Sequence, residues 1–511
     1  MIRIVVTNIQ HSFVRNIACA SNNITSCMGL EYNSNYSSRI AVVIDEGISL
    51  SYGDLAASVG SYVSLLSSKY SLSRGDRLLV KAEKSINILA LYLATLRLGA
   101  IYVPIIPTYT SRETMYFVKD LEPRIFVTSD LNKDCIFINS TPYVVDLSMM
   151  ARDASKYSPD YGMENVLPDD TACICYTSGT TGKPKGAMIT HKGLKWNAES
   201  LIDLWRFVGS DVLLHQLPFY HVHGMFISLN CSLLTKSCII WRPSFTVEDA
   251  LKWLPMSTVM MGVPTYYSRL LKNQEFNVEV TRNIRLFVSG SAPLSSSLAA
   301  DFHSRTGSVI LERYGMTEAA VITSNAYDQN SRLVGSVGKI LKGGEMRLSK
   351  TGVLEIRLPS LFSGYWRNPM KTQESFTDDG FFITGDIGRI DNEGNLWILG
   401  REKDMIISGG LNVSPKEVED IVDSFPFVSE SAVIGIPHSD YGEAVVAICV
   451  KESNSTIVDS RSILEQLKSQ LASYKIPKRI IFLDCLPKNS MGKVQKNLLR
   501  EKYKDLFISN N

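Results

Sequence analysis

The chain has 511 residues, of which 45% are hydrophobic and 20% are charged. This balance is typical of a globular protein large enough for two or more domains, and it excludes a fibrous or disordered chain. A formal net charge of +2 gives no overall electrostatic reason to expect binding to nucleic acid or to a membrane surface.

Residues 1–30 contain no acidic residue, carry Arg3 and Arg15, and are rich in serine and asparagine. This composition predicts either an organellar transit peptide or a disordered tail, so the expected compartment is the cytoplasm or the mitochondrial matrix. The most apolar stretch, Ile88–Ile106, contains an arginine, a glycine and a proline. It therefore predicts a buried helix that continues into a strand, and no transmembrane segment is expected.

Segments with helical and strand-like patterns then alternate along the chain. Helical spacing of apolar residues marks 51–68 and 86–100, and short apolar runs at 77–82 and 101–106 predict strands. The alternation continues as far as the strand-like run at 284–290. Repeated units of this kind predict an α/β fold built on mostly parallel sheets with helices.

The pattern changes near residue 335, where turn residues become frequent and short alternating segments predict a β-rich subdomain of hairpins. After Arg401, two helix-like and three strand-like segments predict a small α+β unit. We therefore expect a large N-terminal domain at 31–401 and a mobile C-terminal lid domain at 402–511.

Tyr176–Gly186, with the sequence YTSGTTGKPKG, is rich in glycine, hydroxyl and lysine residues. An apolar run precedes it and a segment with helical spacing follows, which predicts a loop between a strand and a helix. Backbone N–H groups, hydroxyls and lysines in such a loop favour phosphate binding. The loop is not a Walker A motif, because Gly182-Lys183 is followed by Pro184. The alternative interpretation is a flexible surface turn, which does not need this order of residue types.

The segment RYGMTEA at Arg313–Ala319 places an aromatic ring, a hydroxyl and a carboxylate together. Tyr314 can stack on a flat ring, Thr317 can hydrogen-bond a phosphate, and Glu318 can bind Mg²⁺. Downstream, Asp386 lies in a turn-rich segment, where a carboxylate can accept hydrogen bonds from ribose hydroxyls.

Two segments near the C-terminus complete the set of candidates. Gly400–Glu419 has a charged start and the Gly409-Gly410 pair, and Pro487–Lys496 presents Lys493 directly after a glycine. Taken singly, each signal is weak, because a tyrosine can be core, an aspartate can be a turn residue and a lysine can be a solvated surface residue. The occurrence of all of them in one order, behind a phosphate-type loop, favours a functional interpretation.

With these motifs, the chain resembles the adenylate-forming superfamily of acyl-CoA synthetases, peptide-synthetase adenylation domains and luciferases. The resemblance covers roughly residues 40 to 505. It implies an acid–thiol ligase that uses ATP, Mg²⁺ and coenzyme A. A carboxylate attacks the α-phosphate of ATP, pyrophosphate leaves, and the thiolate of coenzyme A then displaces AMP. The small domain is implied to rotate between the two half-reactions.

The resemblance also implies roles for individual residues, carried over motif by motif. The residues expected at ATP or AMP are Thr177, Ser178, Gly179, Thr180, Thr181, Gly182, Lys185, Ser291, Glu312, Arg313, Tyr314, Gly315, Met316, Asp386 and Arg401. The residues expected in catalysis are Lys493, Thr317, Glu318 and His221, with Thr180 and Glu318 at the metal. The residues expected at coenzyme A are Gly409, Gly410 and Leu411, with Lys403 at the hinge.

The acid pocket is expected near 217–224, 261–267 and 285–293. The candidate acid-binding residues are His221, Arg285, Ser289 and Arg313. A cation there can pair with a second carboxylate of the substrate, although Arg285 can instead cap a strand end at the surface. Taken together, MGVPTYYSRLL, RLFVSGSAPL, ERYGMTE, DDGFFITGD and MGKVQKN resemble the malonyl-CoA synthetases, which implies malonate, with methylmalonate as a weaker substrate. The segment 343–352 is shorter than in many relatives.

Two other interpretations stay open at this point. The nearer one is a ligase for another short, medium-chain or aromatic acid. The more distant one is a non-catalytic sensor of acyl-adenylates on the same fold. The expected partners are the small-molecule substrates alone, without nucleic acid, and the chain is expected to be a monomer or a homodimer.

Overall fold

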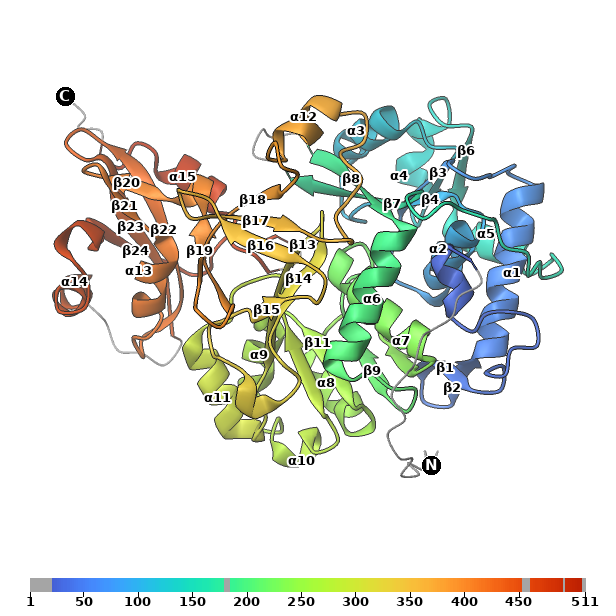
Figure 1. The fold of residues 1–511 in the computed structure, drawn as a ribbon, viewed down its shortest axis with the longest axis horizontal. Helices are drawn as coiled ribbons and strands as arrows, with labels where there is room; N and C mark the ends of the chain where they lie inside the picture. Colours follow the sequence, from blue (N-terminus) through green and yellow to red (C-terminus); the bar gives the residue numbers. More distant parts are fainter. Residues whose placement is uncertain (1–20, 179–183, 453–459, 490–491, 508–511) are drawn as a thin grey trace.

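The computed structural model describes residues 21–178, 184–452, 460–489 and 492–507. Figure 1 shows a large lobe that contains the residues up to β19 and a smaller lobe at the left that contains the C-terminal residues. This arrangement confirms the predicted α/β class with a large N-terminal domain and a small C-terminal one. β19 ends at Arg401 and the turn η6 (Glu402–Asp404) follows directly.

Two sheets of mostly parallel strands form the centre of the large lobe. The first has the order β6-β5-β3-β4-β7-β8 and is parallel except for the β7–β8 pair. Its strands are β3 (Arg77–Lys81), β4 (Ile101–Pro104), β5 (Ile125–Thr128), β6 (Tyr143–Asp146), β7 (Thr171–Ser178) and β8 (Pro184–Thr190).

The second sheet has the order β15-β14-β13-β12-β11-β9-β10-β1-β2, with parallel pairing from β13 to β1 and antiparallel strands at both edges. Its strands are β1 (Ile40–Asp45), β2 (Ile48–Ser51), β9 (Val212–His215), β10 (Cys238–Trp241), β11 (Val259–Gly262), β12 (Leu286–Ser289), β13 (Leu311–Met316), β14 (Ala320–Ser324) and β15 (Lys339–Ile340).

Two smaller sheets complete the fold. The predicted β-rich subdomain is an antiparallel sheet of β16 (Glu345–Leu348), β17 (Val353–Arg357), β18 (Phe382–Ile390) and β19 (Leu396–Arg401). The small lobe contains β20 (Ile406–Ser408), β21 (Leu411–Val413), β22 (Val428–His438), β23 (Gly442–Lys451) and β24 (Arg479–Leu483). Alternation along β22 explains its burial on both faces, because Val433 packs in one apolar cluster and Ile434 in another.

The helices pack on these sheets. In the large lobe they are α1 (Tyr52–Ser68), α2 (Ile86–Arg97), α3 (Ser111–Leu121), α4 (Leu131–Asp134), α5 (Leu147–Ala154), α6 (His191–Trp205), α7 (Leu229–Thr235), α8 (Val247–Trp253), α9 (Pro264–Leu271), α10 (Val278–Thr281), α11 (Ser296–Thr306) and α12 (Pro369–Glu374). In the small lobe they are α13 (Pro415–Val422), α14 (Ser460–Lys468) and α15 (Lys496–Tyr503). The short helices are η1 (Ile24–Cys27), η2 (Cys135–Phe137), the π-helix η3 (His223–Ser228), η4 (Leu254–Met256), η5 (Gln329–Ser331) and η7 (Ser473–Lys475).

The apolar stretch Ile88–Ile106 folds as predicted, because α2 is buried and leads into β4. Helix α1 begins at a capping box in which Ser51 accepts a hydrogen bond from the Asp54 N–H at 3.0 Å and Asp54 accepts one from the Ser51 N–H at 2.9 Å. None of the described helices has the length and apolar character needed to cross a membrane.

The structure corrects part of the prediction for residues 1–30. Residues 1–20 lie outside the described part of the chain, but residues 21–30 are folded against the large lobe. Ile24, Met28 and Leu30 are fully buried, and the Asn23 side-chain amide donates a hydrogen bond to the carbonyl of Leu96 at 2.7 Å. The apolar side chains of Ile24, Met28 and Leu30 complete the core beside α2. The serine- and asparagine-rich composition of this segment did not indicate that contribution.

Candidate functional site

The residues on either side of the predicted phosphate loop form two paired strands. Gly179, Thr180, Thr181 and Gly182 fall outside the described residues, so their phosphate and metal roles stay predictions. β7 and β8 flank the loop as antiparallel partners, with Thr177 opposite Lys185. The expected junction of strand and helix is therefore wrong, since α6 begins only at His191. The segment between the loop and α6 is the strand β8, whose residues are buried or half-buried.

Glu318 is the carboxylate beside this hairpin. It is 6% exposed, and the Tyr365 hydroxyl donates a hydrogen bond to its Oε1 at 3.0 Å. Burial raises the pKa of Glu318, and a hydrogen bond from the Thr177 side chain opposes that rise. Lys185 lies 5.7 Å above the ring of Tyr365. The sequence analysis missed Tyr365, whose only signal is an aromatic residue in a glycine-rich turn.

Glu318 is a suitable ligand for Mg²⁺. No group of three or more metal-binding side chains occurs among the described residues. Mg²⁺ is commonly held by one or two carboxylates together with substrate phosphates, so a single buried carboxylate beside a phosphate loop is sufficient.

Asp386 is the centre of a second group of side chains. The Arg401 Nε lies 2.7 Å from Asp386 Oδ1, and the Tyr314 hydroxyl donates a hydrogen bond to Oδ2. Asp386 and Arg401 face each other across the β18–β19 pair, and Tyr314 comes from β13. Burial and the neighbouring Asp386 carboxylate raise the pKa of Tyr314 well above its usual value, so the phenol stays a hydrogen-bond donor.

The small lobe brings Lys493 to this group. The side chain of Lys493 is exposed, but the surrounding protein and the Arg401 charge lower its pKa, while Asp386 and Asp404 oppose that shift. A Cβ atom on the preceding Gly492 would lie 3.0 Å from the Thr265 hydroxyl of α9, so the lysine loop touches the large lobe directly. Lys493 and Asp386, predicted separately from distant motifs, therefore belong to one site.

The residues predicted at coenzyme A lie elsewhere. Gly409, Gly410 and Leu411 form the turn between β20 and β21. Both glycines have a positive φ, a Cβ on Gly410 would meet no atom within 4 Å, and Leu411 is 50% exposed. The structure does not bring these residues to Lys493 in this arrangement of the lobes, so their role stays a prediction.

The carboxyl ends of β12 and β13 carry the nucleotide and acid candidates. Ser289 pairs with Glu312 in this parallel register, and ligands of α/β sheets bind at such strand ends. Glu312 accepts a hydrogen bond from the Gly335 N–H at 3.0 Å, and burial raises its pKa to about 7. Gly315 and Met316 are the last two residues of β13, Thr317 begins the turn that follows, and all three are partly buried.

Arg313 is the unusual residue of this region. It is 5% exposed, and its Nε and Nη2 have no hydrogen-bond partner among the described residues. The guanidinium lies against Gly290, where a Cβ atom would be 2.4 Å from Arg313 Cζ. Burial lowers the pKa of Arg313 to about 10, so the side chain stays charged at neutral pH. No carboxylate in the described part of the chain lies within 4 Å of it.

Further unsatisfied polar groups surround Arg313. The Ser289 hydroxyl and His223 Nε2 are buried without a partner among the described residues, and His223 Nδ1 lies 3.3 Å from the Ser291 hydroxyl. Burial, followed by the charge of Arg313, holds the pKa of His223 well below its usual value, and burial lowers that of His221 to about 4. Buried polar groups normally find partners, so this cluster indicates a site for an anionic ligand.

Arg285 does not belong to this cluster, which corrects one of the two arginine predictions. Its Nε and Nη2 bind the buried carboxylate of Asp211 at 2.7 and 2.6 Å, and it donates further hydrogen bonds to the carbonyls of Trp205 and Arg206. It precedes β12, whereas Ser289 ends that strand, so the two lie roughly 13 Å apart along the chain. The alternative interpretation, that Arg285 caps a strand end, agrees with its position directly before β12 and with its hydrogen bonds to the two carbonyls.

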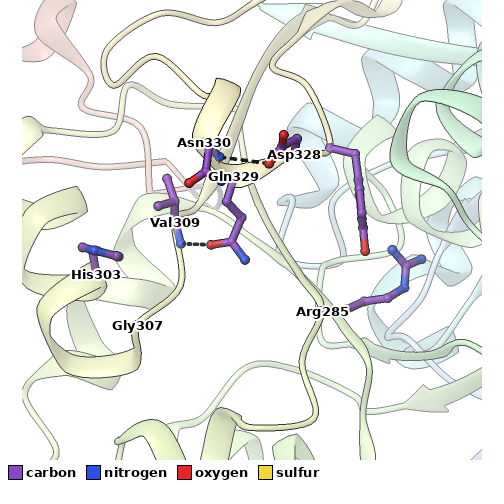
Figure 2. A pocket seen from close by; sticks show the side chains of 8 residues that line it. Arg285, His303, Gly307, Val309, Asp328, Gln329 and Asn330 are labelled. Atoms are coloured by element: carbon purple, nitrogen blue, oxygen red, sulfur yellow. Dashed lines mark hydrogen bonds between the residues drawn. The ribbon is translucent and has the colours of Figure 1, made fainter.

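Figure 2 shows Arg285 at the edge of a different cavity, of about 440 Å³, with His303 and Asp328 at other parts of the wall. This cavity lies at the amino ends of the strands. It therefore shares no residue with the cluster around Arg313.

Lys84 is another residue that the sequence analysis missed. Its Nζ lies 2.7 Å from His215 Nδ1 and 2.8 Å from the His215 carbonyl, over the ring of Trp241. An ammonium only donates, so His215 Nδ1 accepts and Nε2–H donates to the carbonyl of Gly224 at 2.8 Å. Gly224 lies in the π-helix η3, directly after His223. Lys84 and His215 thus support the backbone of η3, which begins at His223.

Comparisons with known proteins agree with this geometry. The family model described as AMP-binding enzyme matches residues 31–366, and the model of its C-terminal domain matches 417–493. The chain therefore belongs to the AMP-binding enzyme family.

Individual relatives are also similar over most of their length. A malonate–CoA ligase of Arabidopsis thaliana is 32% identical, over 92% of this chain and 87% of the relative. An indoleacetate–CoA ligase of Aromatoleum aromaticum is 30% identical, over 88% of this chain and 93% of the relative. The ATP-bound structure of MatB from Rhodopseudomonas palustris superimposes with a TM-score of 0.91 at 41% identity, covering 95% of this chain and all of that chain.

The Asp386 group generates a first prediction. Asp386→Asn removes the charge that pairs with Arg401 and weakens the acceptor for ribose hydroxyls. We expect the dissociation constant for AMP, measured by titration calorimetry, to rise about tenfold or more, in line with the loss of one charge-assisted hydrogen bond. Asp378→Asn, at an exposed turn before β18, is the control and should bind AMP as the wild type does. Equal AMP affinity of Asp386→Asn and the wild type would show that Asp386 does not contribute to nucleotide binding.

Proposed function

We propose that this chain is a malonate–CoA ligase that forms malonyl-CoA from malonate, ATP and coenzyme A through a malonyl-adenylate. The observation that carries the proposal is the buried, charged Arg313 without a protein carboxylate in the described residues. Malonate is a dianion, so one carboxylate can react while the other meets a fixed cation. The similarity to malonate–CoA ligases over nearly the whole chain supports the same choice.

The position of α9 supports a site with two anionic ends. Thr265 of α9 is touched by the loop that presents Lys493. Tyr267, two residues further on, donates a hydrogen bond to the carbonyl of Val288 at 2.7 Å and interacts electrostatically with Arg313. Helix α9 therefore contacts the lysine loop through Thr265 and interacts with Arg313 through Tyr267, and a diacid with one carboxylate for each cation is the proposed substrate class. Methylmalonate, which adds one methyl group, is proposed as a weaker substrate.

The chain's own residues account for the first half-reaction. Lys493 would approach the reacting carboxylate and the α-phosphate together, where its charge offsets their mutual repulsion. Asp386 and Arg401 would orient the ribose, and the ring of Tyr314 would lie against the adenine. Glu318 and Thr180 would hold Mg²⁺, which spreads the charge of the leaving pyrophosphate when bound. Thr177, Ser178, Thr181 and Lys185 would contact the phosphates.

The second half-reaction, thioester formation, requires a different set of residues. Lys493 would withdraw with the small lobe, and rotation about Lys403 would bring Gly409, Gly410 and Leu411 toward the thiol path. This exchange fits an arrangement in which the Gly492 turn beside Lys493 contacts Thr265 of the large lobe, while a Cβ atom on Gly410 would meet no atom within 4 Å.

A ligase for a monocarboxylic acid is the second candidate, and the similarity to an indoleacetate–CoA ligase favours it. Such an acid would leave Arg313 buried and unpaired, which costs free energy that a dicarboxylate offsets. A panel of acetate, octanoate, indoleacetate, malonate, methylmalonate and succinate, with ATP, Mg²⁺ and coenzyme A, tests the proposal by mass of the thioester. Preference for a monocarboxylate would overturn malonate while leaving the ligase class intact.

Replacement of Arg313 tests the acid site. Arg313→Met keeps an apolar stem but removes the partner of the second carboxylate, a loss on the order of 2–5 kcal/mol. We expect kcat/KM for malonate to fall about 30-fold or more and that for acetate to change little. Arg285→Met is the matched control, because it should lower the melting temperature by breaking the Asp211 pair but leave the ratio of malonate to acetate unchanged. Loss of that ratio in Arg285→Met alone would place the acid pocket elsewhere.

Half-reaction assays test the separate roles proposed for Lys493 and for Gly410 of the small lobe. Lys493→Ala should abolish ATP–pyrophosphate exchange with malonate, yet still convert pre-formed malonyl-AMP and coenzyme A to thioester. Gly410→Leu should show the reverse, since a bulky residue would block the thiol path. Equal loss in both assays for a folded Lys493→Ala protein would contradict the two-arrangement mechanism.

Lys84 generates a prediction about the acid end. Lys84→Met removes the donor that fixes the tautomer of His215, so the support of Gly224 weakens while the apolar stem is kept. We expect the KM for malonate to rise about tenfold and the KM for ATP to stay unchanged. Lys69→Met, which breaks an exposed pair with Asp153, should leave both constants as they are. A change of both constants in Lys84→Met would indicate general destabilisation instead.

A further inference from the structure

Helix α15 connects the loop of Lys493 to the core of the small lobe. It begins at Lys496, three residues after the lysine. Leu499 is 1% exposed and packs in the apolar cluster that also contains Ile434 and Ile436 of β22. The position of this helix therefore determines where the Lys493 loop begins.

Two ion pairs fix α15 on either side of Leu499. Lys496 Nζ lies 2.6 Å from Glu419 Oε1, and the same oxygen accepts the Val433 N–H at 2.8 Å. Arg500 Nη2 lies 2.9 Å from Asp404 Oδ1. Because Lys496 and Arg500 are four residues apart, both cations project from one face of the helix. One end of the helix is thus held by α13, and the other by the segment that joins the lobes.

Asp404 occupies a special place in the chain. It is the last residue of η6, which directly follows β19 and Arg401. The next residue, Met405, donates its N–H to the carbonyls of Arg401 at 3.1 Å and Glu402 at 3.3 Å, so the turn is tight. The Asp404 carboxylate also acts electrostatically on Lys493. Asp404 therefore contacts both the connection between the lobes and the elements that present the lysine.

We propose that the Arg500–Asp404 pair is a positioning element that fixes the Lys493 loop relative to the turn η6, so that Lys493 reaches Asp386 and Arg401 in register. This proposal rests on the proposed function of Lys493 and adds two positioning residues, Arg500 and Asp404, to it. Neither Arg500 nor Asp404 contacts substrate. The pair should affect adenylate formation, which needs Lys493 beside Asp386 and Arg401. Thioester formation does not need Lys493 in this position.

Charge-neutralising variants test the pair in the full-length protein. Arg500→Met and Asp404→Asn are each assayed for ATP–pyrophosphate exchange with malonate and for thioester formation from pre-formed malonyl-AMP and coenzyme A. We expect exchange to fall about tenfold or more and thioester formation to change less than about twofold. The double variant should be no slower than either single variant, because the two residues act through one contact.

Three further variants separate positioning from simple stability. Asp404→Arg combined with Arg500→Asp reverses the pair and should recover most of the exchange activity, and Arg500→Lys should retain it. Lys504→Met breaks the exposed Lys504–Glu501 pair near the C-terminal end of the same helix and should change neither assay. Melting temperatures of all variants show whether the fold is kept.

Two outcomes would overturn the pair's role. The first is unchanged exchange in both single variants. The second is an equal fall of both half-reactions that the reversed pair does not recover. Failure of the proposed function is distinguishable, since it would appear as wild-type protein inactive on malonate in both assays. The same variants would then be compared on the acid that the wild type does activate.

Discussion

The Asp386–Arg401 ion pair is the contact on which the arrangement of the site depends. A carboxylate that is 3% exposed is costly unless it is paired and hydrogen-bonded, and Asp386 satisfies this condition with Arg401 and Tyr314. The pair joins β18 to the last residue of β19, so it holds the point from which the small lobe departs. Arg401 and Asp386 also act on Lys493 in opposite directions, since the arginine lowers the pKa of the lysine and the aspartate raises it.

The polar groups around Arg313, at the proposed acid site, differ from Asp386 because they are buried without being paired. Arg313, Ser289 and His223 have buried polar atoms without partners among the described residues, so the folded protein bears their desolvation cost. Such violations of hydrogen-bond satisfaction are expected at functional sites and are offset by the packing of the rest of the chain. Gly290 makes this arrangement possible, because only a residue without a Cβ lets the guanidinium lie so close to the backbone. The site is preorganised for an anion at the expense of stability.

Periodicity predicted the elements well where one physical signal dominated. The buried helix α2 and strand β4 followed from apolar spacing alone, and the small lobe followed from its alternating segments. The phosphate loop was assigned to the wrong junction because β8 contains a proline and a glycine and its buried positions do not alternate, so no strand pattern separates the loop from α6. The contribution of residues 21–30 to the core was missed because polar composition outweighed three buried apolar positions.

The site could be predicted in part by the same reasoning. Motif order predicted one site for Asp386, Arg401 and Lys493, and in the structure both Arg401 and Asp386 act electrostatically on Lys493, although 92 residues separate Arg401 from Lys493 in sequence number. Arg285 could have been rejected from the sequence, because it precedes its strand and ligand sites lie at carboxyl ends. Lys84 and Tyr365 could not have been found, because their roles depend on contacts between different sheets.

Helix α9 shows how substrate choice and the movement of the small lobe are physically connected. Thr265 contacts the Gly492 turn, and Tyr267 acts electrostatically on Arg313, so the proposed acid site and the lysine loop both adjoin one helical turn. The α9 helix starts at Pro264 and is fixed by the Tyr267 hydrogen bond to β12, which leaves it little freedom to adapt. An acid that fills the space between Arg313 and the lysine loop therefore meets both ends without a change in the helix. Helix α9 thus links the proposed acid site at Arg313 to the loop that presents Lys493, because one helix contacts both.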